Sequence, residues 1–208
     1  MEEFLIGDKV IFYHKSLDGG GTTFGINALK HPEIVPYINK GKILEICSGP
    51  GFMGFYLNFM GFCDQLTLSD INEENNSYIN ETIKKNNLEN TNFLVSDGFN
   101  SFGTGEIYNT IVSNPPHFKT SRPGGYRSEH EKLISLDENM EFHKKFFKDV
   151  VEYINQDSKI ILVENAAGVN AQDIIELTKD TFNILLVHYD KYGWEGESSF
   201  YTIILKLK

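Results

Sequence analysis

The chain of 208 residues lacks several features that mark common protein classes. Its two cysteines, Cys47 and Cys63, are too few for a disulfide framework or a cysteine-based zinc site. Its six histidines show no metal-ligand spacing, so no metal site is predicted. No apolar run approaches the ~18 residues that cross a bilayer, and the first residues are acidic. We therefore expect a soluble cytoplasmic protein without a membrane partner.

Positive charge is also scarce. Lysine and arginine together number 19 against 29 aspartates and glutamates, which gives a formal net charge of -10. A negative balance opposes attraction to phosphate backbones and to anionic lipid. A small-molecule or peptide substrate is therefore favoured over nucleic acid as the partner. No pattern indicates the oligomeric state.

The order of apolar runs indicates the fold. From Lys42 onward, strand-like runs such as "KILEI", "QLTLS", "TNFLV", "YNTIVS" and "KIILVE" alternate with helical patterns at 52–60, 72–86, 137–155 and 170–180. Such alternation predicts a parallel sheet with helices on both faces. The last runs, "FNILLVHYD" and "SSFYTIILKLK", flank the turn-rich "KYGWEGE". This arrangement predicts a strand pair and an antiparallel last strand.

A glycine turn follows the first of these strands in "ILEICSGPGFMGFYL". Gly49, Gly51 and Gly54 spell G-x-G-x-x-G, and Asp70 lies about 20 residues later, so the dinucleotide fingerprint is formally satisfied. Glu45, however, stands directly before the turn, where its carboxylate would repel a pyrophosphate. The turn therefore suits a cationic ligand, and a nicotinamide-dependent dehydrogenase is the last-ranked interpretation.

Acidic residues stand at the ends of three successive strands, where ligands bind in open α/β sheets. Besides Glu45, Asp70 is placed to accept hydrogen bonds from two ribose hydroxyls, with Ile71 as an apolar plate for a purine. Asp97 is placed to accept from an exocyclic amine. Each acid alone is more often a cap or a solvated turn residue. Together they describe an adenosine that carries an ammonium or sulfonium group.

Four segments resemble the motifs of the class I S-adenosylmethionine-dependent methyltransferases: "LEICSGPG", "LTLSDIN", "FLVSDGF" and "IVSNPPHF". The resemblance implies an α/β, Rossmann-like sheet, mostly parallel with an antiparallel last strand and helices on both faces. It also implies a methyltransferase domain over residues 42–208, with residues 1–41 as an N-terminal extension that packs on it. Cys47 departs from the family, since the turn usually has its first glycine there.

The same resemblance implies S-adenosyl-L-methionine as the cofactor. Residues of the first motif are expected around its methionine part, those of the second at the ribose and those of the third at the adenine. The implied cofactor-binding residues are Glu45, Cys47, Gly49, Gly51, Asp70, Ile71, Asp97, Gly98, Phe99 and Asn114.

The fourth motif, Asn114-Pro115-Pro116-His117, resembles the Asn-Pro-Pro-aromatic signature of enzymes that methylate planar nitrogen, in nucleobase amines or in glutamine amides. The Asn114 side-chain oxygen and the Pro115 carbonyl can each accept a hydrogen bond from a substrate –NH2. The prolines stiffen the turn. His117 occupies the usual aromatic position, which favours stacking on a flat substrate; proton acceptance is the alternative. These four residues are the predicted catalytic set.

Two glycine-containing segments lie outside the alternation of strands and helices. "SLDGGGTTFG" resembles a segment of the small-domain methyltransferases, some of which methylate guanine in ribosomal RNA, and places His14 and Asp18 either at the substrate side or in a structural turn. "FKTSRPGGYRSEH" carries Lys119, Arg122 and Arg127 and is interpreted as a lid over a compact substrate.

The residues thus favour an enzyme that methylates an amine or amide nitrogen of a small molecule or peptide. Two alternatives stay open: a methyltransferase for RNA or DNA bases, and a non-catalytic nucleotide-binding domain. Secondary candidates are Glu164 and Asn165 at the end of the fifth strand, as substrate contacts or a helix cap, and Trp194 in the last loop. His143 is interpreted as a surface or core-edge residue of a helix.

Overall fold

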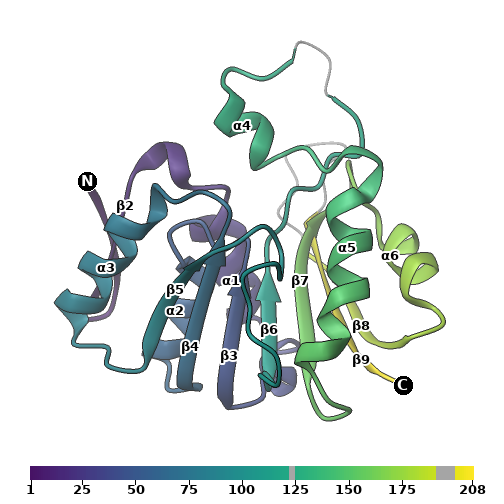
Figure 1. Cartoon of the computed structure of the whole chain (residues 1–208), viewed down its shortest axis with the longest axis horizontal. Helices are drawn as coiled ribbons and strands as arrows, with labels where there is room; N and C mark the ends of the chain where they lie inside the picture. Colours follow the sequence, from purple (N-terminus) through teal and green to yellow (C-terminus); the bar gives the residue numbers. More distant parts are fainter. Residues whose placement is uncertain (122–124, 191–199) are drawn as a thin grey trace.

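A seven-stranded sheet forms the centre of the computed structural model, which describes residues 1–121, 125–190 and 200–208 (Figure 1). Its strand order is β5-β4-β3-β6-β7-β9-β8; the first five are parallel, and β9 is antiparallel to both of its neighbours. The predicted antiparallel last strand is confirmed. The strands are β3 (Gly41–Ile46), β4 (Cys63–Asp70), β5 (Thr91–Val95), β6 (Thr110–Ser113), β7 (Lys159–Asn165), β8 (Phe182–Tyr189) and β9 (Phe200–Leu207).

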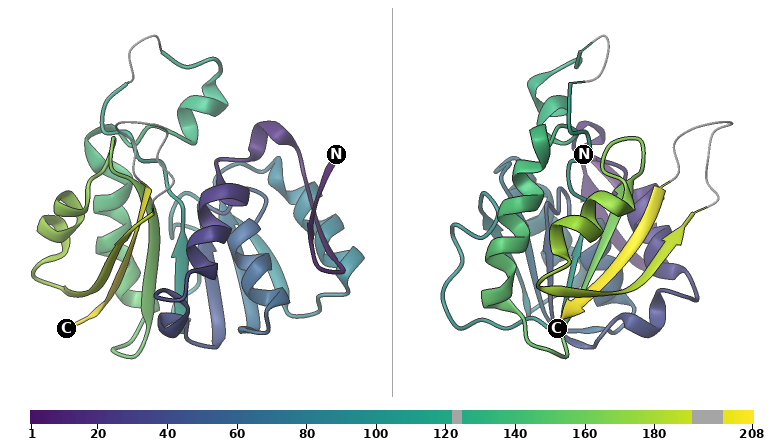
Figure 2. Two further views of the ribbon diagram at one scale, coloured as in Figure 1. Left: turned by 180° about the vertical axis from the view of Figure 1, so that it is seen from behind. Right: turned by 90° about the vertical axis from the view of Figure 1, so that its right-hand side faces the viewer.

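Helices cover both faces of this sheet, as the turned views make plain (Figure 2). Adjacent residues of a strand point to opposite faces, so each strand feeds two cores. Ile43 joins a buried cluster with residues of α1, α2 and α3, whereas Leu44 joins a second cluster with residues of α5 and α6. The helices are α1 (Ile26–Lys30), α2 (Phe52–Phe59), α3 (Asn75–Asn86), α4 (Glu129–Leu133), α5 (Glu141–Asp149) and α6 (Ala171–Thr178).

The N-terminal residues form a separate hairpin, β1 (Glu2–Ile6) and β2 (Lys9–Tyr13), which packs on α3. The Asn86 side chain accepts from the Val10 N–H at 3.1 Å and donates to the Val10 carbonyl at 2.7 Å. Residues 14–25 then cross to α1 through two short helical turns, η1 (Lys15–Leu17) and η2 (Gly21–Gly25). The boundary at residue 42 stays a prediction.

The long helix expected over 137–155 is wrong in detail. Three short pieces replace it: η4 (Glu138–Met140), α5 and η5 (Val150–Tyr153). Asn139 and Met140 have φ values of 55° and 61°, which no α-helix accommodates. The physical reason is local capping: Asp137 accepts the Phe142 N–H at 2.7 Å, so α5 begins after this turn instead of running through it.

Candidate active site

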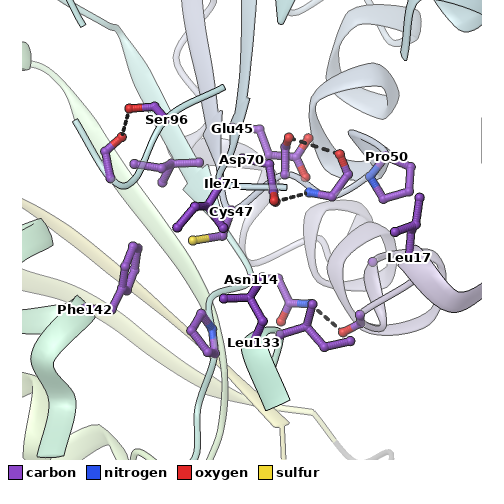
Figure 3. Close-up of a pocket in the computed structure, with 18 of the residues that line it drawn as sticks. Leu17, Glu45, Cys47, Pro50, Asp70, Ile71, Ser96, Asn114, Leu133 and Phe142 are labelled. Carbon is purple, nitrogen blue, oxygen red and sulfur yellow. Dashed lines mark hydrogen bonds between the residues drawn. The ribbon is translucent and has the colours of Figure 1, made fainter. Parts of the chain in front are cut away.

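A pocket of about 230 Å³ lies at the carboxyl ends of β3, β4, β5 and β6 (Figure 3). This is the edge where open α/β sheets bind ligands. Most residues predicted to bind the cofactor line it; Gly51 and Phe99 do not. Those that do are Glu45, Cys47, Gly49, Asp70, Ile71, Asp97, Gly98 and Asn114.

The Glu45 carboxylate faces the helix that follows the glycine turn. Its oxygens accept the N–H groups of Met53 at 3.3 Å and Gly54 at 2.7 Å, so it caps the first turn of α2 from inside the fold. A Cβ on Gly54 would lie 2.9 Å from the Glu45 carboxylate and 2.6 Å from Leu68, which explains this third glycine. Burial raises the Glu45 pKa to about 8, against the opposing effect of the two N–H bonds. A direct contact of Glu45 with a cationic ligand stays a prediction.

The turn after β3 bends through left-handed backbone at three positions. Cys47, Gly49 and Gly51 have φ values of 55°, 49° and 86°. Cys47 stands where the family usually has glycine, and it adopts the conformation that glycine permits without strain. Burial, followed by the neighbouring Asp70 charge, raises the pKa of the Cys47 thiol, so the thiol is neutral. The turn therefore holds a non-glycine residue in a backbone conformation that favours glycine.

Asp70 ties this turn to the loop after β4. Its two oxygens accept the Gly49 N–H at 2.7 Å and the Asn72 N–H at 2.9 Å. Burial raises the Asp70 pKa, while these N–H bonds lower it. Because a carboxylate oxygen has two lone pairs, each can accept one further hydrogen bond. Ile71 beside it is 49% exposed, an apolar surface next to a polar edge. The pair has the character expected for a ribose and a purine.

The residues of the third motif lie partly in the pocket and partly in the core. Asp97 lines the pocket and pairs with Lys145 at 3.0 Å, and Gly98 lies beside it. Phe99 is 5% exposed and stacks on Tyr153 with ring centroids 4.6 Å apart. The Phe99 ring therefore anchors the loop in the core, and the structure does not bring it to the pocket.

Asn114 stands at the junction between the pocket and the fourth motif. Its Nδ2 donates to the Gly19 carbonyl at 3.1 Å. Its Oδ1 is buried and has no hydrogen-bond partner in the part of the chain that the structure describes. An unpaired buried acceptor is costly, by ~1–3 kcal/mol, so this atom is suited to an incoming N–H donor. Pro116 lines the same pocket.

His117 is not among the residues that line the pocket. It is 7% exposed, its Nδ1 lies 3.0 Å from Glu164 Oε2, and its ring meets that of Phe200 edge-on at 5.8 Å. The structure thus places this ring beside a buried carboxylate, and stacking on a substrate stays a prediction. Glu164 itself is inside the protein and is not a helix cap; Asn165 is buried nearby and accepts the Ala167 N–H.

The N-terminal loop supplies one wall of the pocket. Leu17, Gly19 and Gly21 line it. Asp18 accepts the Gly20 N–H at 2.9 Å and the Thr22 hydroxyl at 2.6 Å, so its carboxylate organises its own turn. The exposed His14 caps η1. Neither His14 nor Asp18 lines the pocket, which favours their structural role.

Comparison with known proteins identifies the family. Residues 4–184 match the family described as methyltransferase small domain. The chain belongs to this family. Membership implies S-adenosylmethionine as the methyl donor.

Two of the relatives that the chain resembles are named glutamine methyltransferases. The release factor glutamine methyltransferase of Thermodesulfovibrio yellowstonii is 28% identical over 158 residues, which cover 69% of this chain and 56% of the relative. The ribosomal protein uL3 glutamine methyltransferase of Francisella tularensis subsp. tularensis is 25% identical over 158 residues, which cover 71% and 49% respectively. The chain thus spans about half the length of these relatives.

The fold also matches solved structures. An S-adenosylmethionine-dependent methyltransferase from Clostridium acetobutylicum superimposes with a TM-score of 0.63 at 13% identity, covering 88% of this chain and 89% of the other. The predicted Rossmann-like fold is therefore confirmed.

Sequence reasoning missed the apolar side of the pocket. Leu133, Ile134 and Leu136 line it from the segment that carries α4 above the carboxyl ends of the strands (Figure 1), and Phe142 lines it from α5. The apolar run "LISL" after a polar loop was the one sequence signal for this wall of the pocket. The position of this run over the sheet depends on long-range packing, which the sequence pattern does not indicate. The segment was interpreted only through its glycines and cations.

The cations of this segment have protein partners where the structure describes them. Lys119 contacts Asp173 at 2.6 Å, and Arg127 contacts Glu131 at 2.9 Å. Arg122 lies outside the described residues, as does Trp194. The predicted lid over 119–130 stays a prediction, and its contact with a substrate carboxylate has less support, since both described cations are already paired.

One group of metal-ligating side chains lies elsewhere. His31, Glu33 and His188 place ligand atoms within 4.8 Å of one another, which spacing could not indicate because the two histidines are far apart in the chain. None of the three lines the pocket. In the residues that the structure describes, no helix has the length and apolar character needed to cross a membrane.

Proposed function

We propose that this protein transfers a methyl group from S-adenosylmethionine to the side-chain amide nitrogen of a glutamine in a protein substrate. The observation that carries the proposal is the buried, unpartnered Oδ1 of Asn114 at the edge of the pocket. An acceptor held in this way suits an N–H donor and orients the nitrogen for attack.

The residues present fit the cofactor. Asp70 retains lone pairs for ribose hydroxyls, Ile71 offers an exposed apolar face, and Asp97 lines the same pocket, where its carboxylate is available to an exocyclic amine. When bound, the cofactor supplies an activated methyl group on a sulfonium centre. The Asp70 carboxylate at this edge suits that positive charge and opposes a diphosphate.

The substrate class has three supports. A glutamine amide is planar and carries two N–H groups, which matches the Asn114 oxygen and the adjacent Pro115 carbonyl. Two of the relatives that the chain resembles are named for glutamine methylation. The net charge of -10 opposes the phosphate contacts through which RNA enzymes recruit their substrates.

Methyl transfer from labelled S-adenosylmethionine tests this function. The acceptors offered are a release factor, ribosomal protein uL3 and ribosomal RNA, and peptide mass spectrometry locates the added methyl. A methylated glutamine is the expected product. Transfer to RNA alone would contradict the proposal, as would salt-sensitive nanomolar binding to structured RNA without transfer to protein.

Asn114→Ala separates chemistry from cofactor binding. Turnover should fall about 100-fold or more because the positioning group for the nucleophile is gone. The affinity for S-adenosylhomocysteine, measured by calorimetry, should fall far less than turnover, because the pocket wall loses only the bond from Asn114 Nδ2 to the Gly19 carbonyl. Asn183→Ala on the exposed side of β8 is the matched control and should leave both quantities unchanged. Normal turnover in Asn114→Ala would remove the main support for nitrogen methylation.

A further inference from the structure

Two histidines and two carboxylates meet where the edge strand β8 ends. His31 and Glu33 follow the last residue of α1, whereas His188 and Asp190 lie at the far end of the chain, at the end of β8. Ligand atoms of His31, Glu33 and His188 lie within 4.8 Å of one another. We refer to these three residues as the histidine–glutamate cluster.

The backbone on both sides of the histidine–glutamate cluster is held in place. His31 caps the end of α1, and its carbonyl accepts the Ile34 N–H at 2.9 Å. Ile34 is fully buried, so the turn that carries His31 and Glu33 is anchored in the core. On the other side, His188 is paired with Thr202 of β9. The side chains therefore converge from an anchored turn and a paired strand, which favours a precise binding site.

The spacing within the cluster approaches that of ligands around a metal ion. Zn²⁺ holds imidazole nitrogen and carboxylate oxygen at about 2.0–2.2 Å, so neighbouring ligand atoms of a tetrahedral shell lie roughly 3.3 Å apart. His188 Nδ1 lies 3.0 Å from Glu33 Oε2, and the rings of His31 and His188 have centroids 3.9 Å apart. Since no pair of ligand atoms exceeds 4.8 Å, side-chain movements of about 1–2 Å complete the shell.

Both rings offer a lone pair at this point. His31 Nδ1 accepts the Glu33 N–H at 3.3 Å, a long bond, and an acceptor nitrogen carries a lone pair. His188 presents Nδ1 to Glu33, whereas its Nε2 lies 3.7 Å from Asp190 Oδ1. A histidine that binds a metal commonly directs its other ring N–H to a carboxylate, which fixes the tautomer. With Nε2–H directed to Asp190, the lone pair of His188 is on Nδ1, beside Glu33.

The charges also favour a divalent cation. Glu33 and Asp190 carry two negative charges when ionised, and neutral imidazoles carry none. Within residues 1–121, 125–190 and 200–208, the ion pairs of both carboxylates are with His188 and not with lysine or arginine. Imidazole nitrogen combined with carboxylate oxygen suits Zn²⁺ and related transition metals, whereas Mg²⁺ and Ca²⁺ prefer a shell of oxygen.

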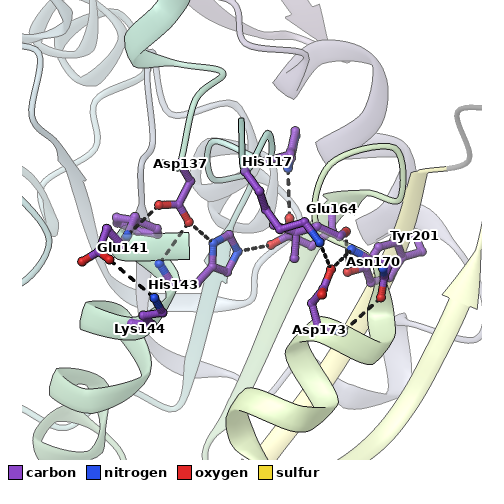
Figure 4. Close-up of polar contacts among 12 residues, drawn as sticks. His117, Asp137, Glu141, His143, Lys144, Glu164, Asn170, Asp173 and Tyr201 are labelled. Carbon is purple, nitrogen blue, oxygen red and sulfur yellow. Dashed lines mark hydrogen bonds and ion pairs between the residues drawn. The ribbon is translucent and has the colours of Figure 1, made fainter. Parts of the chain in front are cut away.

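A second group of histidine and carboxylates has a different arrangement (Figure 4). Each ring nitrogen of His143 faces a separate carboxylate, Nδ1 that of Asp137 and Nε2 that of Glu164, and all three residues are buried. The ligand atoms of that group therefore extend in a line away from solvent. In the histidine–glutamate cluster they gather around one point, and the Glu33 side chain is 62% exposed. A cation from solvent thus has access to this cluster.

We propose that His31, Glu33 and His188 bind one divalent transition-metal cation, for which Zn²⁺ is the probe, with Asp190 as the supporting carboxylate of His188. The fourth coordination position faces solvent and is suited to water. None of the three ligands lines the pocket, so the ion has a structural role. It ties the turn after α1 to the edge strand β8. The inference goes beyond the proposed function and does not depend on methyl transfer.

Calorimetric titration of the full chain with Zn²⁺, after purification without a polyhistidine tag, tests the site. We expect one ion per chain. His31→Gln, Glu33→Gln and His188→Gln each remove a ligand and should weaken binding by about 100-fold or more, beyond the loss typical of a supporting residue. Asp190→Asn should weaken binding by about 10–100-fold. The matched control is His14→Gln, an exposed histidine outside the cluster, which should bind like the wild type.

Thermal unfolding gives a second readout. Zn²⁺ at 100 times its Kd should raise the Tm of the wild type by about 5–10 °C, because it binds the folded chain and links two distant segments. The rise should be absent in His188→Gln and present in His14→Gln. An equal rise in His188→Gln would contradict the proposed ligand set.

Two calorimetric results would overturn the proposal: no Zn²⁺ binding by the wild type, or binding that persists unchanged in both His31→Gln and His188→Gln. If these variants do not fold, nitrogen NMR of the wild-type histidines decides. The ring signals of His31 and His188 should shift when Zn²⁺ is added, and that of His14 should not; shifts confined to other histidines would refute the site. These readouts do not involve methyl transfer, so a failure of the proposed function is distinguishable from a failure of this inference.

Discussion

The left-handed backbone at Cys47 should reverse the usual order of stability between an alanine and a glycine substitution. At an ordinary φ, glycine is less stabilising than alanine by about 0.4–1 kcal/mol, because glycine gains more freedom in the unfolded chain. At a φ of 55° any residue with a Cβ costs about 1–2 kcal/mol, which glycine avoids. The difference leaves Cys47→Gly more stable than Cys47→Ala by about 1 kcal/mol.

Cys63 provides the matched control in the same chain. It is the first residue of β4, and its backbone is not among the positive-φ positions. Cys63→Ala should therefore be more stable than Cys63→Gly by about 0.5–1 kcal/mol. Within each pair, both variants lose the thiol of the same cysteine, so the effect of that loss on stability cancels.

Urea unfolding of the four variants, with thermal scans as a second measure, gives the comparison. About 1 kcal/mol corresponds to a shift of roughly 2–4 °C in Tm for a domain of this size. Cys47→Gly should also keep its affinity for S-adenosylhomocysteine, since the shape of the turn is preserved. If Cys47→Ala proved the more stable of the two, the turn would not hold the backbone strain that its φ indicates.

Three further outcomes are expected. Asp70→Ala should weaken S-adenosylhomocysteine binding by about 1–3 kcal/mol in calorimetry, since it leaves ribose hydroxyls unpaired; unchanged affinity would remove Asp70 from the site. Gly168→Ala should lower the free energy of unfolding by about 1–3 kcal/mol, because its Cβ would lie 2.3 Å from the His117 carbonyl oxygen, whereas Gly103→Ala meets nothing within 4 Å and should not. The folded-state pKa of His143 is raised from 6.5 to about 9, so its contribution to stability is full below 6.5 and is lost as pH rises through about 9; unfolding of His143→Gln across this range should lack that loss.

The predictable part of the site follows from strand periodicity. Alternating apolar runs predicted parallel strands, and parallel strands end at one edge, so Asp70, Asp97 and Asn114 were expected to converge. Their convergence on the pocket needed no knowledge of tertiary packing. The antiparallel last strand was predictable for the same reason, from two strand-like runs around one turn-rich loop.

What could not be predicted is the direction in which each side chain turns. Glu45 lies at a strand end but caps α2, and Phe99 lies in a binding motif but packs in the core. His143 was interpreted as a surface or core-edge residue, yet it is fully buried between Glu164 and Asp137. Such outcomes depend on contacts between distant segments, which spacing along the chain does not encode.

The bond from Asn114 Nδ2 to the Gly19 carbonyl links the proposed substrate-binding side chain to the wall of the pocket. The amide whose Oδ1 we propose to accept from the substrate also holds the backbone that walls the pocket beside Leu17 and Gly21. A ligand that contacts this wall would therefore also bear on the position of the Asn114 oxygen, through the bond to Gly19. Reciprocity of binding requires the converse, so each ligand should tighten the binding of the other by the same factor.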